Sequence, residues 1–290
     1  MTRRQELLGT ILVALAAAGW GTWALFLRGS GLAPAWQSVM ILLAIALVWL
    51  PAAAVASLRR ERRSAGAWGL LGLAALTDAG NYLCYFGALD RGPIALAVLT
   101  HYLAPVVVAV LAPVLLREAL TRRTIAALAV SLGGLALLVL GGGGLAGAPG
   151  RTAALGAASA IFYGLNTLLT KKLLDRFAAS ELLSYHCLLS AALVAIFAGP
   201  PPPLSAFFWS PLAGAFLLGA AGAAAFYAGL RIIPAQRAAV LTYLEPLVAA
   251  LVGWLFFAEP LGPAGLLGGA LIIAGGAAVA LVPSDVGPLG

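Results

Sequence analysis

The chain has 290 residues, of which 62% are hydrophobic and only 9% charged, and its mean hydropathy is +1.03. A soluble domain is about 25% charged, so this composition excludes a soluble globular protein and predicts an integral membrane protein. The net charge of +7 is then informative mainly through its distribution along the chain. The two cysteines, Cys84 and Cys187, form neither a disulfide framework nor a metal-binding spacing.

Ten apolar runs follow one another along the chain, and each is long enough for a membrane-spanning helix of about 20 residues. The runs lack the period-two alternation of strands in a membrane barrel. The first run follows Arg3 and Arg4 and exceeds the apolar core of a signal peptide, so we expect it to be the first span. The runs cover approximately 6–27, 35–57, 66–89, 93–116, 122–141, 152–174, 180–198, 210–230, 234–257 and 262–282.

The loops between these runs carry their positive charges unevenly. If the N-terminus lies in the cytoplasm, every Lys and Arg except Arg28, Arg91 and Arg151 falls on the cytoplasmic side. Because Lys and Arg concentrate in cytoplasmic loops, this asymmetry predicts ten spans with both termini in the cytoplasm. The same asymmetry explains the positive net charge as a topology signal. The expected partner is therefore the lipid bilayer and not nucleic acid.

The chain contains an internal repeat. Residues 88–120 align without a gap on residues 229–261, at a constant offset. Two apolar helices match partly by composition, so most of the weight rests on the Tyr-Leu-x-Pro stretches at 102–105 and 243–246.

The repeat divides the chain into two halves of five spans, 1–143 and 150–290, with a glycine-rich linker between them. A weaker match pairs Trp20-Gly21 with Tyr163-Gly164. Because five is an odd number, the second half enters the membrane from the opposite side. The sequence therefore predicts an all-α membrane protein with two inverted five-helix repeats, a construction common among secondary transporters.

Two of the runs carry stripes of polar and aromatic side chains at i, i+3, i+4 and i+7, a spacing that places four residues on one helix face. The stripes are Asp78, Asn81, Tyr82 and Tyr85 in the third run, and Tyr163, Asn166, Thr167 and Thr170 in the sixth. Polar groups inside a membrane face a cavity or a partner. Each stripe therefore lines a cavity or forms a hydrogen-bonded helix contact, and Asp78 alone is also compatible with a structural cap.

Two prolines inside apolar runs predict helix kinks at equivalent positions of the two halves. They are Pro105, preceded by His101 and Tyr102, and Pro246, preceded by Tyr243 and Glu245. A mid-helix proline frees the carbonyl four residues earlier, here that of His101 or Thr242, and in lipid such a carbonyl needs a partner. In both halves a freed backbone carbonyl lies beside polar side chains, and this coincidence predicts a central binding site. The alternative is that the kinks serve only helix packing.

Trp20 lies too deep in the first run for an interfacial belt and is expected to line the cavity, whereas Trp23 lies nearer the boundary. His186 is expected to be a packing histidine. The chain has no Gly-x-Ser-x-Gly elbow and no His-Glu-x-x-His. The sequence thus predicts no catalytic residues, no metal and no cofactor.

The ten spans, the five-plus-five repeat and the mirrored pattern Pro105…Glu118 and Glu245-Pro246…Glu259 resemble the EamA branch of the drug/metabolite transporter superfamily. The resemblance extends over essentially the whole chain and is greatest to the bacterial amino-acid exporters. It implies a substrate cavity between the halves, lined mainly by the first, third, fourth, sixth, eighth and ninth helices. It also implies export across the inner membrane.

The leading hypothesis is an exporter of amino acids, including aromatic and other neutral ones. The amine would meet Glu245 or Asp78, and the side chain would stack on Trp20 and Tyr82. Purine-type metabolites and cationic drugs fit the same residues. Mirrored halves argue against an enzyme or a scaffold, and the mirrored kinks with aromatic residues favour an occludable pocket over a channel, which would need a continuous polar lining. Proton coupling through His101, Asp78 and Glu245, facilitated flow, the oligomeric state and the resting conformation are left open by the sequence.

Overall fold

A computed structural model describes residues 2–59, 63–140, 150–202 and 209–280, and these residues form helices and no strand. The helices are α1 Arg3–Trp20, α2 Ala24–Leu27, α3 Pro34–Leu58, α4 Ala65–Leu89, α5 Ile94–His101, α6 Ala104–Leu115, α7 Arg122–Leu140, α8 Gly150–Leu173, α9 Ala179–Glu181, α10 Cys187–Ala195, α11 Trp209–Gly214, α12 Gly222–Ile232, α13 Ala235–Leu241, α14 Leu244–Phe257 and α15 Pro263–Ala280, with π-helical turns η1 at Leu182–His186 and η3 at Ala215–Ala221. Each of the ten apolar runs corresponds to a helix or to consecutive helical segments.

Eight of the described helical segments are long and apolar enough to cross a membrane. They are Arg3–Leu27, Pro34–Leu58, Ile94–Leu115, Arg122–Leu140, Gly150–Leu173, Trp209–Ile232, Ala235–Phe257 and Pro263–Ala280. Ala179–Ala195 is a shorter apolar helix, and the 25-residue α4, which carries a polar stripe, is not among the eight. The helices thus confirm the predicted all-α membrane class.

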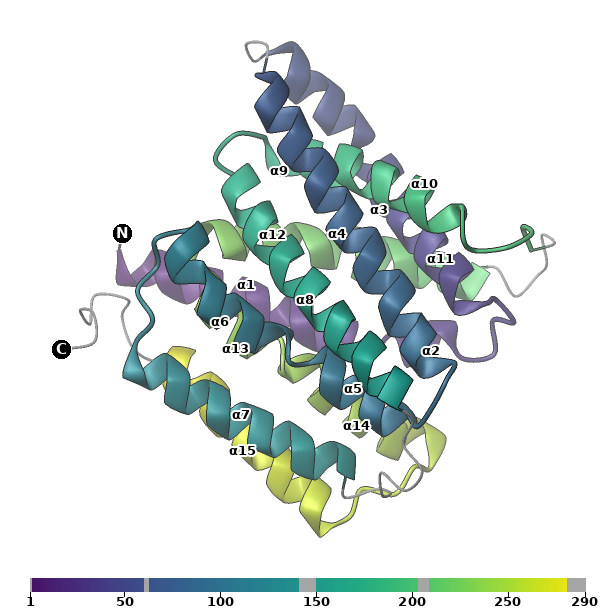
Figure 1. Cartoon of the computed structure of the whole chain (residues 1–290), viewed down its shortest axis with the longest axis vertical. Coiled ribbons are helices and arrows are strands. Elements are labelled where there is room, and N and C mark those ends of the chain that lie inside the picture. The colour runs from purple at the N-terminus through teal and green to yellow at the C-terminus, as the bar shows by residue number, and fades with distance from the viewer. Residues whose placement is uncertain (1, 60–62, 141–149, 203–208, 281–290) are drawn as a thin grey trace.

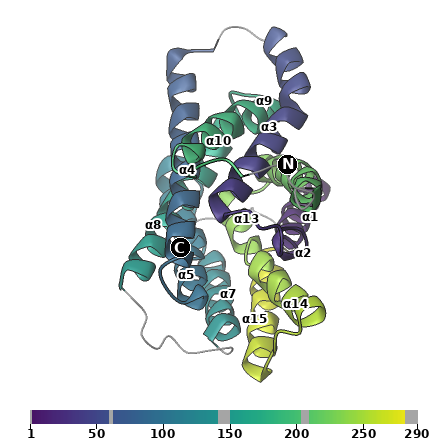
Figure 2. The same ribbon diagram turned by 90° about the vertical axis from the view of Figure 1, so that its right-hand side faces the viewer.

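The helices pack in pairs that take one member from each half of the chain. α4 packs along α8, α1 along α12, α3 against α10, and α7 along α15. Figure 1 shows α7 and α15 side by side at one edge of the molecule, and in the turned view of Figure 2 they are again adjacent. The two halves are therefore interleaved, and a cavity between them can draw side chains from both.

Two helices are interrupted at nearly equivalent positions of the aligned segments. α5 ends at His101 and α6 begins at Ala104, while α13 ends at Leu241 and α14 begins at Leu244. The second break differs from the expectation in one respect. The carbonyl of Thr242 is not freed, because it accepts a hydrogen bond of 3.0 Å from the Glu245 N–H.

The two broken helices are crossed at very short range by helices of the opposite half. A Cβ on Gly21 would lie 2.6 Å from Cβ of Val248, and a Cβ on Gly164 would lie 2.9 Å from Cβ of Val107. Separations below about 3.0 Å are essentially never seen for real Cβ atoms. Glycine is thus required at both crossings. The crossings determine how closely the helices around the cavity approach one another.

Candidate functional site

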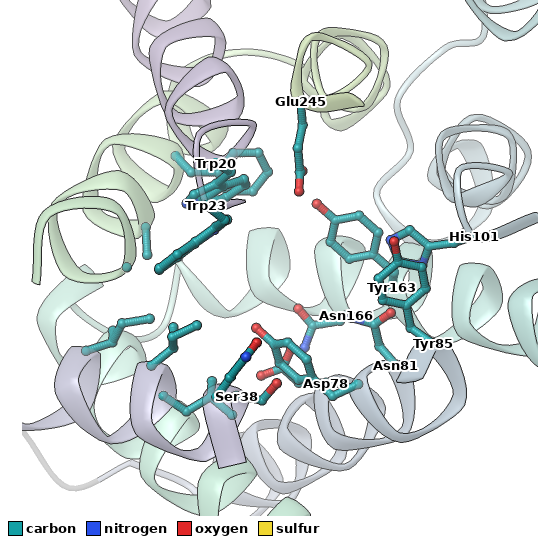
Figure 3. Close-up of a pocket in the computed structure, with 18 of the residues that line it drawn as sticks. Trp20, Trp23, Ser38, Asp78, Asn81, Tyr85, His101, Tyr163, Asn166 and Glu245 are labelled. Carbon is teal, nitrogen blue, oxygen red and sulfur yellow. The ribbon is translucent and has the colours of Figure 1, made fainter. Parts of the chain in front are cut away.

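A cavity of about 430 Å³ lies between the two halves of the chain. Figure 3 shows Glu245 and Trp20 on one side of it and Asp78, Ser38 and Asn166 on the other. Its charged lining residues are the two carboxylates Asp78 and Glu245, and among the residues that the structure describes no Lys or Arg lines it. Aromatic rings form much of the remaining wall.

Ten of the eleven predicted site residues line this cavity. They are Trp20, Asp78, Asn81, Tyr82, Tyr85, His101, Tyr102, Tyr163, Asn166 and Glu245. The eleventh, Tyr243, is fully buried behind the lining, with a relative exposure of 0%. The two helical stripes and the two helix breaks thus converge on one space, although they are far apart in the sequence.

The stripe on α4 faces the cavity near the middle of its helix. Asp78 lies at the centre of α4, so it is not a helix cap, in contrast to one alternative that the sequence left open. One of its carboxylate oxygens is 3.7 Å from Nε2 of His186, and the Ser190 side chain lies beside it. The Asn81 side-chain oxygen is buried and has no hydrogen-bond partner in the described structure, so it is an acceptor available to a ligand.

The stripe on α8 supplies Asn166, which ties three helices together. Its side-chain nitrogen donates to the Ala74 carbonyl at 2.8 Å and lies 3.1 Å from Nε2 of His186. His186, expected to serve in packing, also lines the cavity because it lies in the π-helical turn η1. A π-helical turn is often found at a functional site, and the sequence pattern around His186 gave no signal of it.

The His101 ring lies between two tyrosine rings. Its centroid is 4.3 Å from that of Tyr85 and 5.4 Å from that of Tyr163, and the Tyr163 ring is nearly parallel to it at 7°. Nδ1 of His101 is 2.5 Å from the Ser159 hydroxyl. This contact fixes the imidazole against α8, so three elements share one rigid aromatic wall.

The two equivalent tyrosines meet at the junction of the helix breaks. The Tyr243 hydroxyl donates a 3.0 Å hydrogen bond to the Tyr102 carbonyl, just before Pro105. The Tyr102 side chain in turn hydrogen-bonds the Glu245 carboxylate. Tyr243 therefore supports the wall that presents Glu245, which explains why it lies outside the lining itself.

Trp20 and Trp23 both line the cavity, so Trp23 is not confined to the membrane boundary. Trp20 donates through Nε1 to the Leu218 carbonyl at 3.0 Å, and its ring lies 5.2 Å from that of Phe226. Leu218 belongs to the π-helical turn η3, where carbonyls are displaced from regular helical partners. The indole position is therefore fixed by the second half of the chain.

Several lining residues were missed by the sequence analysis. They are Gln37, Ser38, Ile41, Leu42 and Ile45 from α3, Cys187 from α10, and Phe226 from α12. Tyr227 of α12, which the sequence left ambiguous, lines the cavity as well. The lining is therefore not confined to the six helices that the family resemblance implied, since α3 and α10 contribute as well. Of these, only the adjacent polar pair Gln37-Ser38 offered a signal in the sequence. No group of three His, Cys, Asp or Glu residues in the described ranges could hold a metal ion.

Comparisons with known proteins identify the family. The profile of the EamA-like transporter family matches the chain twice, over residues 7–140 and 150–281. An uncharacterized transporter of Archaeoglobus fulgidus is 30% identical over 215 residues, which cover 71% of this chain and 74% of the relative. A crystal structure with 25% identity covers 94% of this chain and 98% of its own, with a TM-score of 0.80. The chain therefore belongs to the EamA-like transporter family, and it is a multi-pass membrane transporter.

Proposed function

We propose that this transporter consists of two inverted repeats, 1–143 and 150–290, with ten spans and both termini in the cytoplasm. The backbone supports the repeat, because the same unusual conformation occurs at residues that are matched in the alignment of residues 88–120 with residues 229–261. Arg117 and Ala258 have positive φ angles of 59° and 55°. The following residues, Glu118 and Glu259, donate their N–H groups to the carbonyls of Ala112 and Gly253. A positive φ is uncommon outside glycine, so its recurrence at this offset argues for a shared ancestral half.

The proposed substrate is a small metabolite with a protonated amine, and neutral amino acids, including aromatic ones, are the first candidates. The observation that carries this proposal is the lining, which has two carboxylates, many aromatic rings and no Lys or Arg among the described residues. A buried carboxylate is stabilised by a cation. An amine satisfies this requirement, whereas an anionic metabolite would find no positively charged partner.

Glu245 is the preferred amine site. Asp78 already has His186 and Ser190 beside it, whereas the contact described for Glu245 is the Tyr102 side chain. An aromatic substrate side chain would stack on Trp20 and Tyr82, and an α-carboxylate would accept hydrogen bonds from Tyr85 and Tyr163. These contacts would fit an aromatic amino acid, which we propose is exported across the inner membrane.

Organic cations without a carboxylate are the second candidate class. The same lining favours them, because its described residues offer no guanidinium or ammonium group to an α-carboxylate. Aromatic faces also attract cations by about 0.5–2 kcal/mol. The two classes differ in whether the substrate carboxylate is tolerated, which a transport assay resolves directly.

Counterflow in proteoliposomes tests the proposal. Vesicles would be loaded with unlabelled Trp, Phe, Thr or Met, with a purine nucleoside, or with a cationic dye, and uptake of the labelled compound followed. Saturable exchange of an amino acid supports the first class, and dye exchange alone supports the second. Exchange of neither an amino acid nor the dye would contradict an amine substrate. An imposed proton gradient then distinguishes coupled export from facilitated flow.

A further inference from the structure

Two ion pairs join the halves of the chain at opposite ends of the molecule. Glu118, after α6, pairs with Lys171 in α8 at 2.9 Å, and Glu259, after α14, pairs with Arg28, after α2. Figure 1 shows the end of α6 and the regions of α2 and α14 on opposite sides. Each of the two glutamates that follow a broken helix therefore pairs with a basic residue of the opposite half.

The two pairs occupy equivalent positions of the two repeats. Glu118 and Glu259 are matched in the alignment of residues 88–120 with residues 229–261. Arg28 and Lys171 have the same separation in the sequence as Gly21 and Gly164, the glycines of the two close helix crossings. In each pair one member comes from the first half and the other from the second. The same contact is therefore made once at each end.

The environments of the two pairs differ strongly. The side chains of Lys171 and Glu118 are 18% and 15% exposed, whereas those of Arg28 and Glu259 are 51% and 49% exposed. The less exposed pair is also tied to the start of α13. The Glu118 carboxylate accepts from the Ala235 N–H at 2.7 Å, and the Lys171 ammonium donates to the Ile233 carbonyl.

The repeat identifies which contacts are missing at the exposed end. In the same alignment Ile233 and Ala235 are matched with Gly92 and Ile94. In the described parts of the chain, no hydrogen bond links Gly92 or Ile94 to the exposed pair, and Ile94 is 68% exposed. The cavity lining includes Ala24 and Leu27 before Arg28 and their equivalents Thr167 and Thr170 before Lys171. Ala24 and Leu27 are partly exposed, whereas Thr167 and Thr170 are buried, with relative exposures of 6% and 3%. The cavity therefore faces the end where the pair is incomplete.

We propose that the two ion pairs are alternating latches of the transport cycle, and that the present conformation is open on the Arg28 side. This inference rests on the proposed topology, which makes the Glu118 end cytoplasmic. In the opposite conformation Glu259 accepts from the Ile94 N–H, Arg28 donates to the Gly92 carbonyl, and the Glu118–Lys171 pair is exposed. Each latch is strong only when buried, because an exposed ion pair contributes little while removing one partner of a buried pair is costly.

Thiol labelling tests the latches without any substrate. Cys84 and Cys187 would be replaced by alanine, and one cysteine introduced at Ala24 or at Thr167. Both positions line the cavity, and their separation in the sequence equals that of Arg28 and Lys171, so they are mirror probes. A membrane-impermeant maleimide would be applied to spheroplasts, which present the outer face, and to inverted vesicles, which present the cytoplasmic face.

We expect the cysteine at position 24 to react from outside and the one at position 167 to be protected from the cytoplasmic side. Glu118→Gln or Lys171→Gln should raise the labelling of position 167 and lower that of position 24 by about tenfold, a change of about 1.4 kcal/mol in the conformational equilibrium. Arg28→Gln and Glu259→Gln should leave position 167 protected. Lys172→Gln, an exposed neighbour of Lys171, is the matched control and should change neither rate.

Unchanged labelling in the folded Lys171→Gln variant would overturn the proposal, as would exposure of position 167 by Arg28→Gln. Lys171→Gln keeps the assay decisive if Glu118→Gln does not fold, and size-exclusion behaviour in detergent identifies folded protein. The labelling is independent of the substrate. A shift in labelling without amine counterflow would therefore reject the proposed substrate and keep the latches, whereas counterflow without a shift would reject the latches.

Discussion

At the scale of single residues, one carboxylate and one hydroxyl determine the character of the cavity. Glu245 faces the cavity opposite Asp78 (Figure 3) and is hydrogen-bonded by Tyr102. The Tyr102 backbone is in turn supported by the Tyr243 hydroxyl. The two halves therefore share one hydrogen-bonded chain, in which Glu245 is the member available to a ligand and Tyr243 has a structural role.

Replacing Glu245 by glutamine should weaken the apparent affinity for an amine substrate by about tenfold to a hundredfold, since hydrogen bonds to charged groups contribute about 1.5–3 kcal/mol. Counterflow at several substrate concentrations measures this change. Asp90→Asn removes an exposed carboxylate at the end of α4 and serves as the matched control. Equal affinities in Glu245→Gln and Asp90→Asn would contradict the amine site.

Replacing Tyr243 by phenylalanine should lower stability and leave the cavity lining intact. The substitution removes the donor to the Tyr102 carbonyl, and in a membrane protein such a bond contributes about 1 kcal/mol. A thermal midpoint in detergent about 2–4 °C lower is expected. Tyr85→Phe, whose hydroxyl we place with the substrate, is the comparison and should affect transport more than the midpoint. The reverse pattern would show that Tyr243 acts on the substrate.

At the scale of helices, close crossings and helix breaks determine where side chains point. Two glycines let α1 and α8 cross the broken helices of the opposite half, and the breaks turn Tyr102 and Tyr243 toward each other. The π-helical turn η3 offers the carbonyls of Leu218 and Ala220 to the indoles of Trp20 and Trp49. Irregular backbone therefore occurs where buried side chains can form hydrogen bonds with its carbonyl groups.

Gly21→Ala and Gly164→Ala should each destabilise the protein by about 1–3 kcal/mol, because the added methyl group would overlap Val248 or Val107. The yield of monodisperse protein and the thermal midpoint in detergent measure this effect. Gly72→Ala in α4 has open space around its Cβ and should be neutral or stabilising by up to about 1 kcal/mol. Similar midpoints for all three variants would show that the crossings tolerate a side chain.

At the scale of the whole molecule, the pairing of helices follows the internal repeat. α1 packs on α12 as α8 packs on α4, and α7 and α15, the last helices of the two halves, pack on each other. Such mirrored pairing is what two inverted copies of one half produce. It also gives the molecule two related ends, one with the partly buried pair Glu118–Lys171 and the other with the exposed pair Arg28–Glu259.

The proposed topology predicts the location of reporters. Green fluorescent protein fused after the last residue should fluoresce, because it folds in the cytoplasm, whereas alkaline phosphatase at the same site should be inactive. Fusions truncated after Gly31, in the first outer loop, should give the opposite result. A fluorescent fusion at the outer loop together with a dark one at the C-terminus would reverse the orientation that the Lys and Arg distribution indicates.

The sequence by itself determined the membrane class, the apolar runs, the stripes on α4 and α8 and the positions of both helix breaks. These features depend on composition and on periodicity within one segment. Glycine and proline positions also marked where regular helix would be interrupted. That is why ten of eleven predicted site residues lie around one cavity.

Only the tertiary structure decided which distant residues meet. His186 enters the lining through a π-helical turn, Tyr243 turns away from it, and Glu118 pairs with Lys171 of the other half. These outcomes depend on the rotation and register of packed helices, and one residue of register rotates a side chain by about 100° around the helix axis. Sequence periodicity fixes the face within a helix, but packing between helices fixes what that face contacts.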